Sequence, residues 1–133
     1  MQTLLIDDDA ISLFFTEKLF QQAGLSKGLR SFQFPEQALA YVQQALAQQH
    51  ALPEVILLDL HMPVLSGWDF LAALQPYEAQ LVGHCFIYVL TSSLSPLDKA
   101  RSKEIALVTD FIHKPLDNVQ LLAIQAHLVE HPR

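Results

Sequence analysis

Residues 54–67 constrain the fold more than any other part of the chain. Residues 55–58, Val-Ile-Leu-Leu, form an unbroken apolar run that ends in a single acid, Asp59, before Pro63 and Gly67 mark a turn. Such a run, without polar alternation, is typical of a central strand in a parallel sheet covered on both faces. Ligands of open α/β sheets bind beyond the carboxyl ends of the strands, so Asp59 is expected at that edge. Taken alone, the stretch also allows Asp59 simply to cap the loop.

The rest of the chain repeats the same arrangement of a short apolar run followed by a helical pattern. Strands are expected at residues 3–6, 29–34, 55–58, 85–90 and 107–112. The intervening helices are expected to end near Gly24, to begin at Pro35, to run from Ser66 to the region of Pro76, and to span 96–105 and 117–130. Strands that alternate with helices predict an α/β fold, a doubly wound, five-stranded parallel sheet with helices on both faces.

Local signals support the helix boundaries. Ser66 with Asp69 forms a capping-box pattern, and Ser95 with Pro96 and Asp98 repeats it. Asp9 is expected to favour the N-terminus of the first helix. The helical pattern in that first helix consists of Ile11, Phe14, Phe15, Leu19 and Phe20.

Composition limits the classes of protein that remain. The 133 residues, 51% hydrophobic, suit one domain over 1–133 with a real core. A net charge of -6 with only 8 Lys plus Arg argues against nucleic-acid binding. Cys85 is the only cysteine, which excludes an internal disulfide framework and suits a reducing compartment. With no basic leader and no apolar run near the roughly 18 residues that span a bilayer, a cytoplasmic protein without membrane contact is expected.

Polar side chains follow four of the five expected strands. Asp7 and Asp8 follow the first strand, Asp59 the third, Thr91 the fourth and Lys114 the fifth. Carboxylates brought close together repel one another unless a cation compensates. Oxygen ligands without nearby Cys or paired His favour Mg²⁺ over zinc, and such an ion also neutralises a phosphoryl group. The pattern therefore predicts a magnesium site that acts on phosphate.

Each residue of this set has a chemical role that its side chain allows. Asp59 is a candidate nucleophile that forms an acyl phosphate. Lys114 can pair with a phosphate oxygen or with Asp59, and the Thr91 hydroxyl can donate to another phosphate oxygen. Alone, Lys114 would more often be a solvated charge and Thr91 a partner of the backbone. Their position on successive strand ends favours the joint functional interpretation.

Four segments together resemble the receiver domain of two-component response regulators. They are Leu-Leu-Ile-Asp-Asp-Asp at 4–9, Leu-Leu-Asp-Leu-His-Met-Pro-Val-Leu-Ser-Gly at 57–67, Leu-Thr-Ser-Ser at 90–93 and Phe-Ile-His-Lys-Pro at 111–115. The resemblance covers essentially the whole chain, and the joint spacing is highly specific. It implies a flavodoxin-like, CheY-like sheet of order 2-1-3-4-5.

The resemblance also implies a role for particular residues. Asp59 matches the phosphoacceptor, and the Mg²⁺ ligands would be Asp8 directly, Asp7 through water, Asp59 itself and the main-chain carbonyl of His61. Lys114 matches the family's lysine, and its bond to Pro115 the usual cis peptide. Thr91 matches the switch hydroxyl, and Phe111 the switch aromatic, which is often Tyr in this family; plain core packing of Phe111 is the alternative. His61 and Ser93 fall at variable positions thought to tune the phosphoryl lifetime, or they are simply exposed loop residues.

The resemblance implies protein partners rather than small-molecule substrates. A phosphohistidine on a sensor histidine kinase or a histidine phosphotransfer protein would supply the phosphoryl group. The signal would leave through an unknown protein target, by way of the fourth helix, fifth strand and fifth helix, at about 95–130. The last helix has more apolar positions than one buried stripe requires, which suggests a partner or a homodimer on its outer side: Val119, Leu122, Ile124 and Val129.

Three other functions are alternatives to a stand-alone receiver. An aspartyl-phosphate hydrolase of the haloacid dehalogenase type would need an Asp-x-Asp motif after the first strand, which residues 7–9 fit in part, but the loop after Asp59 fits receivers better. A receiver-shaped module that signals without phosphorylation would have lost an acid or the lysine, and none is missing. A flavin-binding protein of similar topology would need a Gly-rich or Ser/Thr-rich phosphate loop after the first strand. The chain lacks such a loop there.

Several other residues are expected to be structural. Cys85 is expected to be a buried hydrophobe, and Trp68 and Phe70 to belong to the core or its border. Five histidines have no metal-ligand spacing and are expected at the surface or in packing contacts: His50, His84, His113, His127 and His131.

Overall fold

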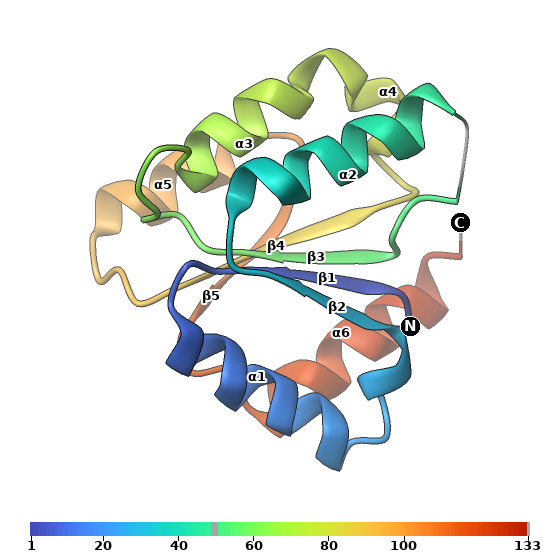
Figure 1. The fold of residues 1–133 in the computed structure, drawn as a ribbon, viewed down its shortest axis with the longest axis vertical. Coiled ribbons are helices and arrows are strands. Elements are labelled where there is room, and N and C mark those ends of the chain that lie inside the picture. The colour runs from blue at the N-terminus through green and yellow to red at the C-terminus, as the bar shows by residue number, and fades with distance from the viewer. Residues whose placement is uncertain (49–50, 133) are drawn as a thin grey trace.

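The computed structural model describes residues 1–48 and 51–132, and it shows a five-stranded sheet between two layers of helices (Figure 1). The strands are β1 (Thr3–Ile6), β2 (Leu29–Phe32), β3 (Val55–Leu58), β4 (Phe86–Thr91) and β5 (Val108–His113). Every neighbouring pair is parallel, and the order is β2-β1-β3-β4-β5. The predicted α/β class, parallel sheet and flavodoxin-like strand order are confirmed.

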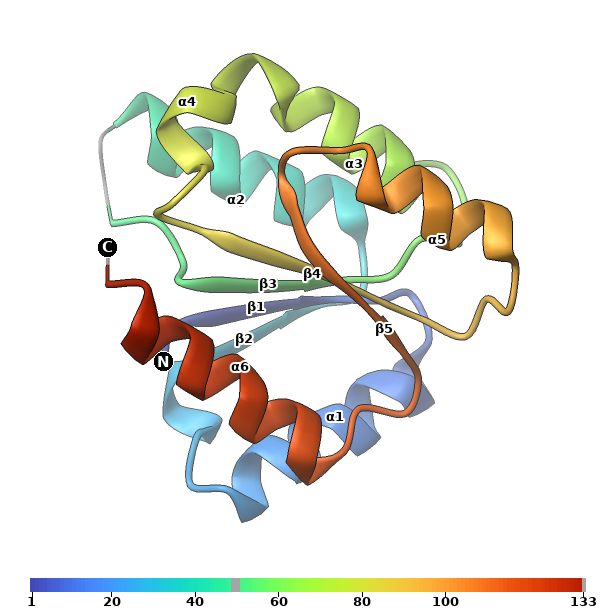
Figure 2. The same ribbon diagram turned by 180° about the vertical axis from the view of Figure 1, so that it is seen from behind.

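Helices cover both faces of the sheet, as predicted. One face carries α1 (Ala10–Gln22) and α6 (Asn118–Glu130), and the opposite side carries α2 (Pro35–Ala47), α3 (Gly67–Leu74), α4 (Glu78–Leu81) and α5 (Pro96–Lys103) (Figures 1 and 2). Short 3-10 turns at Ser26–Gly28 and Gln75–Tyr77 complete the described elements. Among the described residues, no helix combines the length and apolar character needed to span a membrane.

The predicted helix starts are built as their sequences indicate. Asp9 caps α1 by accepting hydrogen bonds from the N–H groups of Ile11 and Ser12. Ser66 and Asp69 form the reciprocal capping box of α3. A side-chain cap of this kind stabilises a helix by about 1 kcal/mol relative to Ala, because it satisfies N–H groups that have no partner within the helix.

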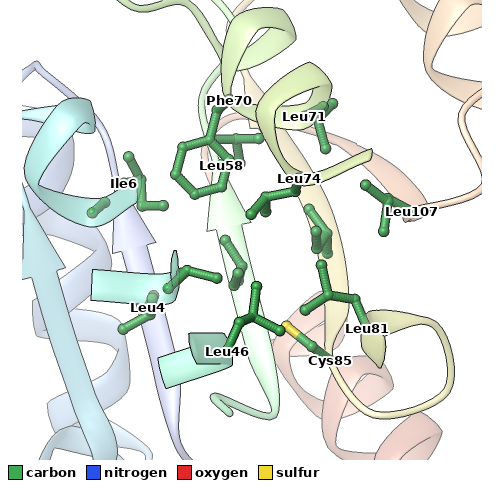
Figure 3. Packing of buried hydrophobic residues seen from close by; sticks show 14 of the residues in the cluster. Leu4, Ile6, Leu46, Leu58, Phe70, Leu71, Leu74, Leu81, Cys85 and Leu107 are labelled. Atoms are coloured by element: carbon green, nitrogen blue, oxygen red, sulfur yellow. The ribbon is translucent and has the colours of Figure 1, made fainter. Parts of the chain in front are cut away.

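Two apolar clusters fill the space between the sheet and its helices. Leu4 and Ile6 of β1 belong to the cluster under α2 and α3, whereas Leu5 belongs to the cluster over α1 and α6. Figure 3 shows part of the first cluster, with residues of α3 packed against the central strands. All four residues of β3 are 0% exposed, so this strand is the centre of the molecule, as the apolar run predicts. Cys85 and Phe70 are buried there, and Trp68 packs at the border.

The apolar spacing of α1 gives an incomplete picture of its buried face. Leu13, Thr16 and Phe20 face the sheet, at spacings of three and four residues that follow the helical period. Three large apolar residues fall outside that stripe and are 68%, 56% and 64% exposed: Ile11, Phe14 and Phe15. Only Phe20 and the half-buried Leu19 of the expected pattern reach the core.

Several boundaries differ by one or two residues from the sequence prediction: β2 ends at Phe32 and not at 34, β5 is Val108–His113 and not 107–112, and α5 ends at Lys103 and not at 105. The helix after Ser66 ends at Leu74, just before Pro76 as expected, but the prediction missed the 3-10 turn Gln75–Tyr77 and the short α4 that follow, whose Leu81 is fully buried. A proline fits the first turn of a helix because its missing N–H would have no partner there anyway. β4 begins at Phe86 rather than Cys85, since the Cys85 N–H still bonds to the Leu81 carbonyl at the end of α4.

Candidate functional site

The register of the sheet brings three acids together at its carboxyl edge. Ile6 of β1 lies opposite Leu58 of β3, so the residues that follow, Asp7 and Asp59, come level with one another. The Asp59 N–H bonds to the Ile6 carbonyl at 3.0 Å, which continues the ladder one step beyond the strands. Carboxylate oxygens of Asp7, Asp8 and Asp59 all lie within 4.8 Å of one another.

These acids are largely removed from solvent. Asp7 is 2% exposed and Asp59 is 6% exposed, while Asp8 is half-buried. Burial raises the pKa of Asp59, and the neighbouring charge of Asp7 raises it further. Lys114 and the N–H groups of His61 and Leu60 act in the opposite direction, but the net pKa is above the usual value of 3.8. The site therefore holds more negative charge than its own groups neutralise.

Lys114 comes from the end of β5, at the edge of the sheet. Its Nζ lies 2.5 Å from Asp7 Oδ2 and 3.6 Å from Asp59 Oδ2. The bond between Lys114 and Pro115 is cis, as the resemblance implies. The Lys114 N–H bonds to the Thr91 carbonyl at 2.8 Å, which ties the end of β5 to that of β4. Lys114 thus follows the last strand of the sheet order, and its side chain extends across the end of β4 to Asp59 and Asp7.

The three acids fit a hard divalent cation. Carboxylate oxygens are the donors that Mg²⁺ prefers, and one lysine does not balance three carboxylates. Asp7 already has Lys114 as a close partner, whereas Asp8 has no salt bridge among the described residues. His61 follows Asp59 by two residues in the same loop, and its N–H group lies close enough to lower the Asp59 pKa. The donor set agrees with the metal expected from the sequence.

The loop after Asp59 depends on a glycine whose reason the sequence alone does not show. A Cβ on Gly67 would lie 2.3 Å from the Asp59 carbonyl oxygen and 2.7 Å from the Leu60 Cα, closer than side-chain atoms can approach. The Gly67 N–H bonds to the Leu60 carbonyl at 2.9 Å. In the same loop, Val64 has a φ of 70°, and its side chain is 96% exposed. Gly67 therefore folds the loop back onto the residue that carries the acid.

Thr91 and Phe111 lie on the side of the site that faces α5. Thr91 is fully buried, and its Oγ1 accepts a hydrogen bond of 3.2 Å from the Ser93 N–H. Phe111 is only half-buried, so it is not a plain core residue. It lines two surface hollows, one of about 300 Å³ against α6 and one of about 400 Å³ against the loop before α5. Phe111 thus lies between two hollows at the edge of the sheet.

Sequence reasoning missed one polar residue of this region. Asp98 was interpreted only as part of a helix cap, yet its Oδ2 lies 2.9 Å from His61 Nε2 and accepts a 2.6 Å hydrogen bond from Ser93 Oγ. No sequence signal links residue 61 with residue 98, because the contact arises only when the two loops are placed at one edge.

Of the five other histidines, His50 lies outside the described residues. His127 and His131 stack on one another at the end of α6.

Comparison with known proteins places this geometry in a family. The family model described as the response regulator receiver domain matches residues 3–126. The hybrid signal transduction histidine kinase I of Dictyostelium discoideum is 32% identical over 82 residues, which are 62% of this chain and 5% of that protein. The chain thus spans about a twentieth of the curated relative that it matches.

Solved structures show the same fold. A two-component response regulator from Cytophaga hutchinsonii superposes with a TM-score of 0.82 at 24% identity, covering 96% of both chains. The chemotaxis protein CheY4 of Vibrio cholerae superposes with a TM-score of 0.70 at 25% identity, covering 94% of this chain and 95% of that one. With the family match over nearly all of its length, this chain belongs to the response regulator receiver domains of two-component signalling.

Proposed function

We propose that residues 1–133 act as one receiver domain that takes a phosphoryl group on Asp59. The observation that carries the proposal is the group of three carboxylates within 4.8 Å of one another, with Lys114 beside two of them. Asp8, Asp59 and the His61 carbonyl would hold Mg²⁺ directly, and Asp7 would hold it through water. Bound there, Mg²⁺ neutralises charge on the phosphoryl oxygens and on the attacking carboxylate.

The chain's own groups account for the rest of the reaction. An Asp59 carboxylate oxygen attacks phosphorus, an oxygen–phosphorus bond forms, and the phosphorus–nitrogen bond of the donor phosphohistidine breaks. The donor imidazole leaves with that electron pair and takes a proton from solvent. Lys114 Nζ can turn from Asp7 to a phosphoryl oxygen, and the Thr91 hydroxyl can donate to another. The family match supports this chemistry over that of a haloacid dehalogenase-type hydrolase.

The donor and the target are proteins in this proposal. A sensor histidine kinase or a histidine phosphotransfer protein supplies the phosphohistidine, and a protein target reads the phosphorylated state. Thr91 moving toward the phosphoryl group leaves space for the Phe111 ring to turn inward, a two-state change next to α5. The chain is otherwise not an enzyme, since it modifies only itself.

The surface that would pass on this change is formed by α5, β5 and α6. Val119, Leu122 and Val129 are 75%, 64% and 81% exposed on α6, which supports contact with a target or a second copy of the chain. Ile124 does not belong to that outer surface, because it is 2% exposed in the cluster beneath the helix. The interpretation of the last helix is corrected for that residue.

The test is phosphorylation by a small donor. Wild-type protein incubated with Mg²⁺ and labelled acetyl phosphate is expected to take up one phosphoryl group, whereas Asp59→Asn is expected to take up none. Asp110→Asn is the matched control, since it removes an exposed acid of β5 away from the three carboxylates. Label that persists on Asp59→Asn would show that another group is the acceptor.

A further inference from the structure

Three polar side chains, which we call the bridge, connect two loops to the first turn of α5. One is the loop after β3, which begins with Asp59, and the other is the loop after β4. His61 lies in the loop after β3, Ser93 in the loop after β4, and Asp98 in α5. His61 Nε2 and Ser93 Oγ both reach the same oxygen of Asp98, at 2.9 and 2.6 Å. Asp98 therefore makes contact with the two loops at one point.

The bridge continues to the buried hydroxyl of Thr91. The Ser93 N–H donates to Thr91 Oγ1 at 3.2 Å, and Ser93 Oγ also accepts from the Ser95 N–H at 3.2 Å. The Ser93 side chain is thus fixed from both directions. If Thr91 Oγ1 moves away from the Ser93 N–H, Ser93 loses that hydrogen bond. Ser93 is also the residue whose hydroxyl bonds to Asp98, so the change can reach α5.

α5 has little else to keep it in place. Of its eight residues only Ser102 is buried, and Leu97 in its first turn is 80% exposed. One turn beyond Asp98, the Arg101 guanidinium lies 4.2 Å from the centre of the Trp68 ring. Ile105, just past the helix, adds a partly buried apolar contact. Because apolar burial is small here, polar contacts carry an unusually large share of the attachment.

The contact between His61 and Asp98 is a hydrogen bond at the surface, with the His61 side chain 58% and the Asp98 side chain 20% exposed. Alone, such an exposed contact contributes little to stability. It matters here because Ser93 Oγ bonds to the same Asp98 oxygen. The hydrogen bond from Ser93, and then that from His61, hold the pKa of Asp98 below its usual value. One oxygen of the Asp98 carboxylate accepts both hydrogen bonds, which holds the side chain between the two loops.

We propose that Asp98 is a positioning residue that fastens α5 to the loops after β3 and β4. The position of α5 then depends on where the Thr91 hydroxyl and the loop after Asp59 lie. The attachment itself follows from the contacts of the unmodified protein. Its dependence on phosphorylation rests on the proposed function of Asp59. The two parts can be tested separately.

Trp68 provides the first measurement, because it is the only tryptophan and Arg101 covers its ring. If α5 loosens, Arg101 leaves the indole, and acrylamide should quench its fluorescence more strongly. We expect Asp98→Ala and His61→Ala each to raise the quenching constant about twofold, and the double variant to rise no further, since both remove one bridge. Asp98→Asn should stay near wild type, because its amide oxygen can still accept from Ser93 and His61.

Glu104→Gln is the control, an exposed acid at the end of the same helix that makes none of the bridge contacts. Far-ultraviolet circular dichroism shows that each variant is folded. Unchanged quenching in both folded alanine variants would overturn the proposal, whether or not Asp59 can be phosphorylated. A rise as large in Glu104→Gln would overturn it too, because the effect would then reflect helix charge and not the bridge.

The second measurement repeats the quenching after treatment with Mg²⁺ and acetyl phosphate. Phosphorylation should raise quenching in wild type and should add much less in Asp98→Ala, where the attachment is already lost. The coupling is reciprocal: if phosphorylation weakens the bridge, then removing the bridge favours the conformation of the phosphorylated protein. Equal increments in the two proteins would overturn the coupling and leave the attachment standing. No phosphorylation of wild type would refute the proposed function, together with the coupling that rests on it, while the first measurement still decides the attachment.

Discussion

Strands β3 and β5 both end in residues of the site, but they are held very differently. Every residue of β3 is 0% exposed, and the strand ends in Asp59. β5 is an edge strand in which Thr109, Asp110 and His113 are exposed, and it leads into Lys114. The acid that is proposed to do the chemistry stands on the most tightly packed strand. Of the groups proposed to respond to it, Phe111 and Lys114 belong to or follow this edge strand, whereas Thr91 ends the buried β4.

The helices that follow the two central strands repeat this contrast. α3 and α5 both begin with a serine cap and an aspartate three residues later. α3 then buries Phe70, Leu71 and Leu74, whereas α5 buries only Ser102. Similar starting sequences therefore precede one helix with three buried large apolar residues and one with none. The cap pattern marks where each helix begins, but it does not tell how much of the helix is buried.

The largest expected effect comes from the packed strand. Leu57→Ala should lower the free energy of unfolding by about 2–5 kcal/mol, because it leaves a cavity at a fully buried position. Thr109→Ala, on the exposed part of β5, should change it by no more than about 0.5 kcal/mol. Urea denaturation followed by circular dichroism measures both values. Similar losses in the two variants would break the contrast between the strands.

The second effect concerns the metal. Asp8→Asn should weaken Mg²⁺ binding about tenfold or more, the consequence of removing one close unit charge from a partly buried site. Asp7→Asn should weaken it less, since Lys114 Nζ already pairs with the Asp7 carboxylate. Titration of Mg²⁺ followed by Trp68 fluorescence or calorimetry compares the two. Equal or reversed losses would mean that the acids hold the ion in another way.

A third, smaller effect is the pH dependence of the buried acid. The raised pKa of Asp59 means that its ionised form destabilises the folded state at pH values above it. In metal-free buffer, Asp59→Asn should therefore be more stable than wild type at neutral pH, because it removes the buried charge whose pKa is raised. This advantage should shrink as the pH falls through the raised pKa, where wild type gains stability. Urea titrations of both proteins at several pH values, with EDTA present, measure this difference. An advantage of Asp59→Asn that grows as the pH falls would contradict the prediction.

The smallest effect is expected in local opening. Phosphorylation should change amide exchange mainly between Thr91 and Glu130, the part of the molecule that includes α5 and the edge strand β5. Changes of a few tenths of a kcal/mol in opening free energy would be enough to detect. Hydrogen exchange with and without acetyl phosphate measures them. Changes confined to α1 and α2 would show that the signal leaves by another route.

Much of this architecture follows from the sequence, because the strongest local signals agree with the fold. The unbroken run at 55–58 predicts a strand buried on both faces, and the acids after β1 and β3 meet because parallel strands share a carboxyl edge. Ser66 and Ser95 mark their helices correctly. The positions of Asp7, Asp8, Asp59 and Lys114 relative to one another needed no information beyond strand order.

Other features depend on contacts between distant segments and could not be predicted in this way. The pairing of His61 with Asp98 requires the actual course of two loops. Periodicity could not tell that Ile11, Phe14 and Phe15 of α1 lie outside, since the helix has more apolar residues than the sheet can cover. The need for Gly67 is visible only when the loop is seen to return onto Asp59.

Val64 gives the acceptor loop an unusual design property. Its φ of 70° is unfavourable for a β-branched residue, at a cost of about 1–3 kcal/mol, and its side chain packs against almost nothing. Asparagine tolerates this conformation far better. Position 64 is therefore a place where an engineer could gain thermal stability a few residues from the acid, without touching the core, the caps or any of the charged groups.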